Sequence, residues 1–150
     1  MNKIIFVCTG NTCRSPMAEI ILKKLLKDAN ITNVKISSAG LMAVEGEKMS
    51  ENSKIALKEL GFRLYGFKSK RLTPNMVKKA NMVICMTNSH KQSLSAYGFN
   101  NVYTLAEVTG TKDVIDPYGY DLSVYKKTAE QIKYACEIIL KEIKKVRGEE

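Results

Sequence analysis

A cysteine and an arginine near the start of the chain are the residues whose types and spacing most clearly suggest catalytic chemistry. Cys8 and Arg14 enclose a short polar segment, and the apolar, β-branched run 3–7 precedes it. That run is typical of a strand buried on both faces. Ser15 and Pro16 form a favourable helix start, with Ser15 as the N-cap. The segment from Cys8 to Arg14 is therefore predicted to connect a strand to a helix.

Such a loop suits a phosphate-like dianion, because its backbone N–H groups and the helix N-terminus attract anions. Arg14 adds a planar fork of donors for phosphate oxygens. The same environment favours the thiolate of Cys8 over the thiol, which ordinarily titrates near ~8.5. We therefore predict that Cys8 is a nucleophile and that Ser15 stabilises its thiolate as it leaves a phosphoenzyme. Gly10 and Asn11 tolerate the left-handed backbone that the loop requires.

The elements that must position this loop follow from the rest of the pattern, in which apolar runs alternate with helical periodicity. The expected strands cover residues 3–7, 34–38, 82–86 and 101–104, the expected helices 16–29, 50–60, 74–79, 89–97 and 122–146, and a long connection 106–119. This order predicts a single-domain α/β fold over residues 1–150, with a four-stranded parallel sheet flanked by helices on both faces. Ligands then bind beyond the C-terminal ends of the strands, where Cys8 lies.

The composition excludes several classes of protein. With 150 residues, 45% hydrophobic and 26% charged, the chain is neither disordered nor a repeat protein. Its apolar runs are too short for a signal peptide or a membrane span, so we expect a cytoplasmic protein that does not bind a membrane. We also expect a monomer. The net charge of +9 favours anionic partners. Without an arginine-rich tract or aromatic platform, that charge does not predict nucleic-acid binding, which would be steeply salt-dependent.

Residues 7–19, V-C-T-G-N-T-C-R-S-P-M-A-E, resemble the phosphate-binding loop of the low-molecular-weight protein tyrosine phosphatases. Three further stretches stand where that family has counterparts: S-A-G at 38–40, M-V-I-C-M at 82–86 and D-P-Y-G at 116–119. The likeness therefore covers nearly the whole chain. It implies a protein phosphatase that acts on phosphorylated proteins through a phosphocysteine intermediate and needs no cofactor.

The resemblance also implies roles for individual residues. Cys8 would attack phosphorus, Arg14 and the loop amides would hold the transition state, and Asp116 would protonate the leaving group and then activate water. Asn11 and Ser38 would brace the loop, and Cys13 would trap an oxidised Cys8 as a reversible disulfide. The residues expected to contact the substrate are Thr9, Gly10, Asn11, Thr12, Cys13, Ser15, Tyr118 and Tyr120. No metal site is predicted, because no second C-x2-C or histidine pair accompanies the two loop cysteines.

Thr12 bears on which phosphorylated residue is the substrate. Tyrosine-specific members commonly carry Ile or Leu there, whereas Thr resembles the protein-arginine phosphatase branch. The segment 41–46 also lacks the Trp or Tyr that many tyrosine-specific relatives place on the pocket wall. Guanidine is far more basic than phenol and must leave protonated, which suits Asp116 as proton donor and anionic partner. We therefore favour phosphoarginine, with phosphotyrosine as the alternative.

Two remoter functions also fit parts of the sequence. An arsenate reductase would need further cysteines close together, but Cys85 and Cys136 are expected in the core on different elements. A silent phosphoresidue-binding module would have no need of Cys8 or Asp116, and both are present. His90 is expected on the surface, away from the loop. Phe67 stands about where relatives have a loop-bracing His, so weaker bracing is expected.

Overall fold

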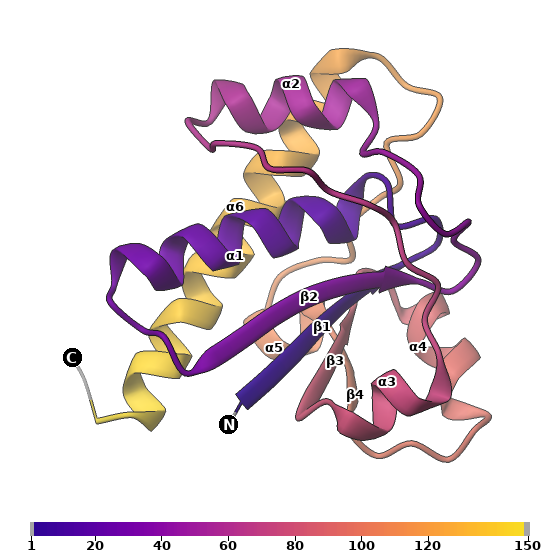
Figure 1. The fold of residues 1–150 in the computed structure, drawn as a ribbon, viewed down its shortest axis with the longest axis vertical. Coiled ribbons are helices and arrows are strands. Elements are labelled where there is room, and N and C mark those ends of the chain that lie inside the picture. The colour runs from indigo at the N-terminus through magenta and orange to yellow at the C-terminus, as the bar shows by residue number, and fades with distance from the viewer. Residues whose placement is uncertain (1, 149–150) are drawn as a thin grey trace.

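The structure, a computed structural model, describes residues 2–148 and has a parallel sheet at its centre (Figure 1). The sheet order is β2-β1-β3-β4, so the strand that leads into the cysteine loop is central. The strands are β1 (Asn2–Cys8), β2 (Val34–Gly40), β3 (Met82–Cys85) and β4 (Val102–Thr104). The helices are α1 (Arg14–Asp28), α2 (Glu51–Glu59), α3 (Pro74–Lys79), α4 (Asn88–Ser95), α5 (Leu105–Thr109) and α6 (Leu122–Val146).

Helices cover both faces of this sheet, as predicted, and bury two separate apolar cores. On one face Ile4 and Phe6 of β1 join the core formed with α1 and α6. On the other face Ile5 and Val7 join the core formed with α3 and α4. Because side chains alternate along a strand, burial on both faces requires the continuous apolar run seen in the sequence. The predicted α/β fold class is confirmed.

Two helical predictions were wrong. Helix α1 begins at Arg14 with Cys13 as its N-cap, rather than at Pro16, and no side chain caps it. The hydroxyl of Ser15 lies instead between Cys8 and Asn11, so it is not available as a cap. The expected long connection contains the short helix α5. Thr104 and Glu107 form a capping box at its start. The spacing of these two residues is a helix signal in the sequence that the prediction overlooked.

The end of β2 lies directly against the cysteine loop. This strand runs two residues further than predicted, and Gly40 pairs with Cys8. Beyond it, Leu41 N–H donates to the Cys8 carbonyl at 3.0 Å and Met42 N–H donates to the Thr9 carbonyl at 2.9 Å. The loop is thus held by main-chain bonds to the segment that directly follows β2. Within residues 2–148, no helix has the length and apolar character needed to cross a membrane.

Replacement of Gly40 by alanine tests this close packing. The new Cβ would lie 2.6 Å from the Thr9 carbonyl oxygen and 2.9 Å from the Asn11 nitrogen, so backbone would have to move. We expect Gly40→Ala to lower the free energy of unfolding by about 1–3 kcal/mol, measured by urea denaturation. Gly66→Ala is the matched control, because no atom lies within 4 Å of its added Cβ. Unchanged stability in Gly40→Ala would contradict the close approach.

Candidate active site

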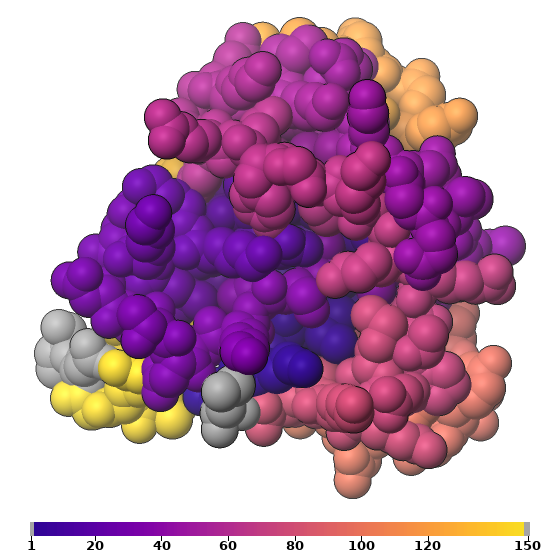
Figure 2. Space-filling model, viewed as in Figure 1, coloured from indigo at the N-terminus to yellow at the C-terminus, as the bar shows by residue number. Residues whose placement is uncertain are grey.

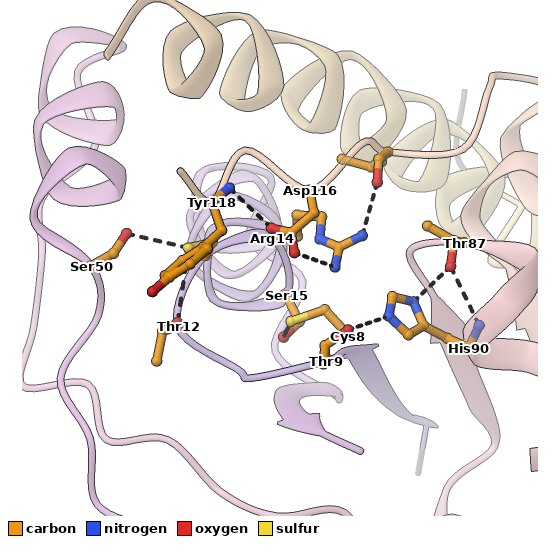
Figure 3. A network of polar contacts seen from close by, with 12 residues as sticks. Cys8, Thr9, Thr12, Arg14, Ser15, Ser50, Thr87, His90, Asp116 and Tyr118 are labelled. Atoms are coloured by element: carbon orange, nitrogen blue, oxygen red, sulfur yellow. Dashed lines mark hydrogen bonds and ion pairs between the residues drawn. The ribbon is translucent and has the colours of Figure 1, made fainter. Parts of the chain in front are cut away.

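Cys8 lies at the C-terminal end of β1 with its thiol beside the hydroxyl of Ser15 (Figure 3). The Sγ–Oγ distance is 2.9 Å, and both side chains are buried. The Asn11 amide nitrogen donates to Ser15 Oγ at 2.9 Å. Because this oxygen already accepts a hydrogen bond from Asn11, the proton of Ser15 itself is available to donate to Cys8 Sγ. This arrangement places a hydrogen-bond donor beside the sulfur.

Asn11 is the residue on which the loop turns. Its φ of 56° is in the left-handed region, which Asn tolerates better than most residues, whereas Gly10 does not adopt a positive φ. The Asn11 amide also donates to Ser38 Oγ at 3.0 Å, and its carbonyl oxygen accepts from Lys70 N–H at 2.9 Å. The bond to Ser38 joins the two residues that the sequence analysis expected to brace the loop.

Glu19 on α1 extends this chain of hydrogen bonds and was missed by the sequence analysis. Ser38 Oγ donates to one of its carboxylate oxygens at 2.6 Å, and Lys23 Nζ lies 2.8 Å from the other. Glu19 is only 5% exposed, although it bears a formal charge. A signal existed, since an acidic residue on the apolar face of a helix needs a partner. We call the five connected residues the relay: Glu19, Ser38, Asn11, Ser15 and Cys8.

Arg14 and Asp116 meet on another side of the loop (Figure 3). Arg14 is buried, and its Nη2 lies 3.6 Å from the Asp116 carboxylate, half of which is exposed. Arg14 Nη1 also donates to the Val114 carbonyl at 3.0 Å. The arginine therefore holds the segment that carries Asp116, which is 102 positions away in the chain. Two sequence-predicted residues are thereby brought together.

His90 contradicts the expectation of a surface residue. It is only 6% exposed, because α4 turns it inward toward the cysteine loop. Its Nε2 lies 2.9 Å from Thr9 Oγ1 and its Nδ1 lies 3.0 Å from Thr87 Oγ1 (Figure 3). Burial, and secondarily the charge of Arg14, lowers the pKa of His90 to about 4. The histidine is therefore neutral near pH 7 and bridges the loop to the start of α4.

The second loop cysteine faces different partners. Cys13 Sγ lies 3.4 Å from Ser50 Oγ, 3.8 Å from Thr12 Oγ1 and 4.0 Å from the Tyr125 hydroxyl. Burial, together with the nearby Cys13, raises the pKa of Tyr125 to about 12, so this phenol remains protonated. A disulfide between Cys8 and Cys13 after oxidation is not tested by these contacts and remains a prediction.

The remaining candidate residues have varied surroundings. Tyr118 and Tyr120 are largely exposed beside Asp116, as substrate-contacting walls would be. Cys85 and Cys136 are buried in the two different cores, which confirms their predicted positions. Burial raises the pKa of Cys85 to about 12 and also raises that of Cys136, so neither forms a thiolate readily. Among residues 2–148, no group of His, Cys, Asp and Glu side chains is arranged to hold a metal ion.

Comparison with known proteins identifies the family. Residues 3–148 match the low molecular weight phosphotyrosine protein phosphatase family, and the chain belongs to it. It is 40% identical to a protein-arginine-phosphatase of Bacillus subtilis, over 96% of this chain and 98% of that protein. It is 38% identical to the low molecular weight protein-tyrosine-phosphatase PtpB of Staphylococcus haemolyticus, over 88% and 93%. The resemblance inferred from the loop is confirmed.

A solved structure agrees with this assignment. The YwlE arginine phosphatase, in a mutant form with a phosphorylated active-site serine, superposes with a TM-score of 0.88. The two chains are 38% identical, and the match covers 95% of this chain and 96% of the other. In that structure the phosphoryl group is on the active-site serine.

The buried position of His90 predicts an unusual titration. The chain contains one histidine, so its ring signals in NMR are unambiguous. The negative charges of Asp116 and Asp113 oppose the effect of burial and Arg14, yet the pKa of His90 still falls to about 4. We expect the ring to stay neutral from pH 7 to pH 5. A midpoint near the ordinary value of ~6.5 would contradict the buried bridge.

The same titration affects stability. In the unfolded chain the histidine gains a proton below pH ~6.5, whereas in the folded protein it stays neutral down to about pH 4. The contribution of His90 to the stability of the folded state is therefore fully present above pH ~6.5 and is lost as the pH falls toward 4. Between pH 7 and pH 5, the wild type should therefore lose about 1–2 kcal/mol more unfolding free energy than His90→Gln. Equal pH dependence of the two proteins in urea denaturation would argue against it.

Proposed function

We propose that this protein hydrolyses phosphoarginine in proteins through a phosphocysteine intermediate on Cys8. The observation that carries the chemistry is the Ser15 hydroxyl 2.9 Å from a buried thiol at the start of an anion-binding loop. The family membership and the relatives named protein-arginine-phosphatase support the same reaction. We further expect a cytoplasmic monomer that acts on phosphorylated proteins and does not bind nucleic acid.

In the first step, the loop amides and Arg14 hold the phosphoryl oxygens. Cys8 Sγ attacks phosphorus, and an S–P bond forms as the P–N bond to the substrate breaks. Asp116, in its acid form, transfers its proton to the departing guanidine nitrogen. The carboxyl group is half-exposed and can therefore exchange protons with water. After proton transfer, its negative charge also attracts the guanidinium product.

In the second step, Asp116 takes a proton from a water molecule whose oxygen attacks phosphorus. The S–P bond breaks, inorganic phosphate forms, and the electron pair returns to Cys8 Sγ. The Ser15 hydroxyl donates to the resulting thiolate and lowers the barrier to its departure. The same hydrogen bond thus assists both the attack and the departure of sulfur.

The surroundings of the loop support arginine as the substrate. Thr12 is half-buried and places its hydroxyl at the loop, where it can hydrogen-bond to a substrate directly or through water. The exposed apolar side chains of the segment that follows β2 are Met42 and Val44, and neither is aromatic. An alkyl-guanidinium group needs a carboxylate more than a flat stacking surface, and Asp116 supplies one.

Phosphotyrosine hydrolysis is the second candidate, with the same residues in the same steps. The exposed rings of Tyr118 and Tyr120 favour it, because either could stack on a phenyl group. Family relatives named as tyrosine phosphatases agree. An arsenate reductase is disfavoured, since Cys85 and Cys136 lie in cores on opposite faces of the sheet.

A comparison of the two substrates tests the proposal. We expect kcat/KM of the wild type to be higher for a phosphoarginine peptide than for a phosphotyrosine peptide of the same sequence, measured by phosphate release. Thr12→Ile should lower the ratio of these two constants by about ten- to a hundredfold, because a hydrogen bond made in the transition state is worth about 1–3 kcal/mol.

Thr111→Ile is a matched control. Thr111 follows α5, its hydroxyl hydrogen-bonds to that of Thr109, and it lies outside the cysteine loop. It should leave the substrate ratio unchanged. A wild-type preference for phosphotyrosine, or a ratio that Thr12→Ile does not alter, would replace the arginine assignment with the tyrosine one.

A further inference from the structure

The connector between α2 and α3, residues 60–73, is attached to the relay at two points. It contains no helix and runs over the surface of the molecule, across α1 and β2 (Figure 2). The Lys70 N–H of the connector donates to Asn11 Oδ1 at 2.9 Å. The Tyr65 hydroxyl donates to the Glu19 carboxylate oxygen that also accepts from Lys23. The connector therefore contacts the relay near its middle and at its far end.

The direction of the hydrogen bonds in the relay depends on Glu19. A carboxylate only accepts, so the proton of Ser38 must point toward Glu19, and Ser38 Oγ is left to accept from Asn11. Asn11 donates its other amide proton to Ser15, which leaves the Ser15 proton for Cys8. Because Ser38 Oγ needs a donor, Asn11 presents its Nδ2 to both serines, so the orientation of the Ser15 proton is determined by Glu19, three residues back along the relay.

Tyr65 is suited to hold Glu19 in place. Lys23 belongs to the same helix as Glu19, and its side chain is 43% exposed, so water competes for it. Tyr65 comes from a different segment and adds a neutral donor to the same oxygen. Burial and the adjacent carboxylate raise the pKa of Tyr65 far above its usual value, so the hydroxyl remains a donor.

Phe67 does not supply this contact. Its ring is 8% exposed and packs into the core formed with α1 and α6. The weaker bracing expected from Phe67 is therefore offset by a hydroxyl two residues earlier in the chain. The spacing of Tyr65 from the loop motif gave no indication of this contact.

We propose that Tyr65 is a positioning residue for Cys8, which it influences by holding Glu19 and, through the relay, by keeping the Ser15 proton directed at the sulfur. The proposal rests on the proposed function only in that Cys8 is the nucleophile. It predicts that loss of one surface-segment hydroxyl changes the reactivity of a buried thiol in the absence of any substrate.

The test is the pH dependence of Cys8 alkylation by iodoacetamide, with the modified residue identified by peptide mass spectrometry. In Tyr65→Phe, the profile of Cys8 alkylation against pH should move to higher pH, and the alkylation rate at pH 6 should fall about two- to tenfold. Tyr134→Phe is the control, because Tyr134 is 61% exposed on α6, and its profile should match the wild type. A purely structural role for Tyr65 would lower the melting temperature without moving the alkylation profile.

A double-mutant cycle tests whether the effect passes through the relay. In a Ser38→Ala background, where the relay is already interrupted, Tyr65→Phe should change the alkylation rate by less than twofold. Additive effects, or an unchanged profile in Tyr65→Phe alone, would overturn the proposal. If Cys8 of the wild type itself reacts as slowly as an ordinary thiol at pH 6, the proposed function fails instead, so the two failures are distinguishable.

Discussion

The left-handed backbone of Asn11 is the constraint on which the site depends. With φ at 56°, the loop reverses so that the Asn11 side chain lies inside the turn, fully buried. From there it donates to Ser15 and Ser38 and accepts from the connector. A buried amide that uses both donors and its acceptor has one favourable orientation, and that orientation directs the Ser15 proton to Cys8.

The parallel sheet explains why these groups can meet. The C-terminal ends of β1, β2 and β3 lie at one edge, so the cysteine loop, Ser38 and the segment leading to His90 converge there. Arg14 then draws in the Asp116 segment through the Val114 carbonyl and an ion pair. Each of these interactions joins residues that are close in space but far apart in the sequence, so the site depends on the whole fold.

Local sequence was sufficient for much of this architecture. The run 3–7 predicted a central strand because burial on both faces requires continuous apolar side chains. Cys8 and Arg14 were recognisable because their spacing fits a phosphate loop, and Asp116 because of its motif. The fold class, the sheet and the family were all predictable on these grounds.

The residues that were missed depend on tertiary contacts. His90 reads as a polar residue on a short helix, and only the packing of α4 against the loop buries it. Tyr65 lies in a connector without periodicity, so nothing in its neighbourhood indicates that it reaches Glu19. Ser15 has the local signature of a helix cap, but its bonds to Cys8 and Asn11 take precedence. For His90 and Tyr65, a hydrogen bond between residues far apart in the sequence outweighs the local preference, whereas for Ser15 the competing bonds lie within the loop itself.

The central claim is that the phosphoryl group passes through the sulfur of Cys8, and trapping it there is the most direct test. Protein turning over a phosphoarginine peptide would be quenched in denaturant within milliseconds and its peptides analysed by mass spectrometry. The account predicts one phosphoryl group on the Cys8 peptide, and none in Cys8→Ala. Turnover by Cys8→Ala at the wild-type rate, or a phosphoryl group on a different residue, would contradict it.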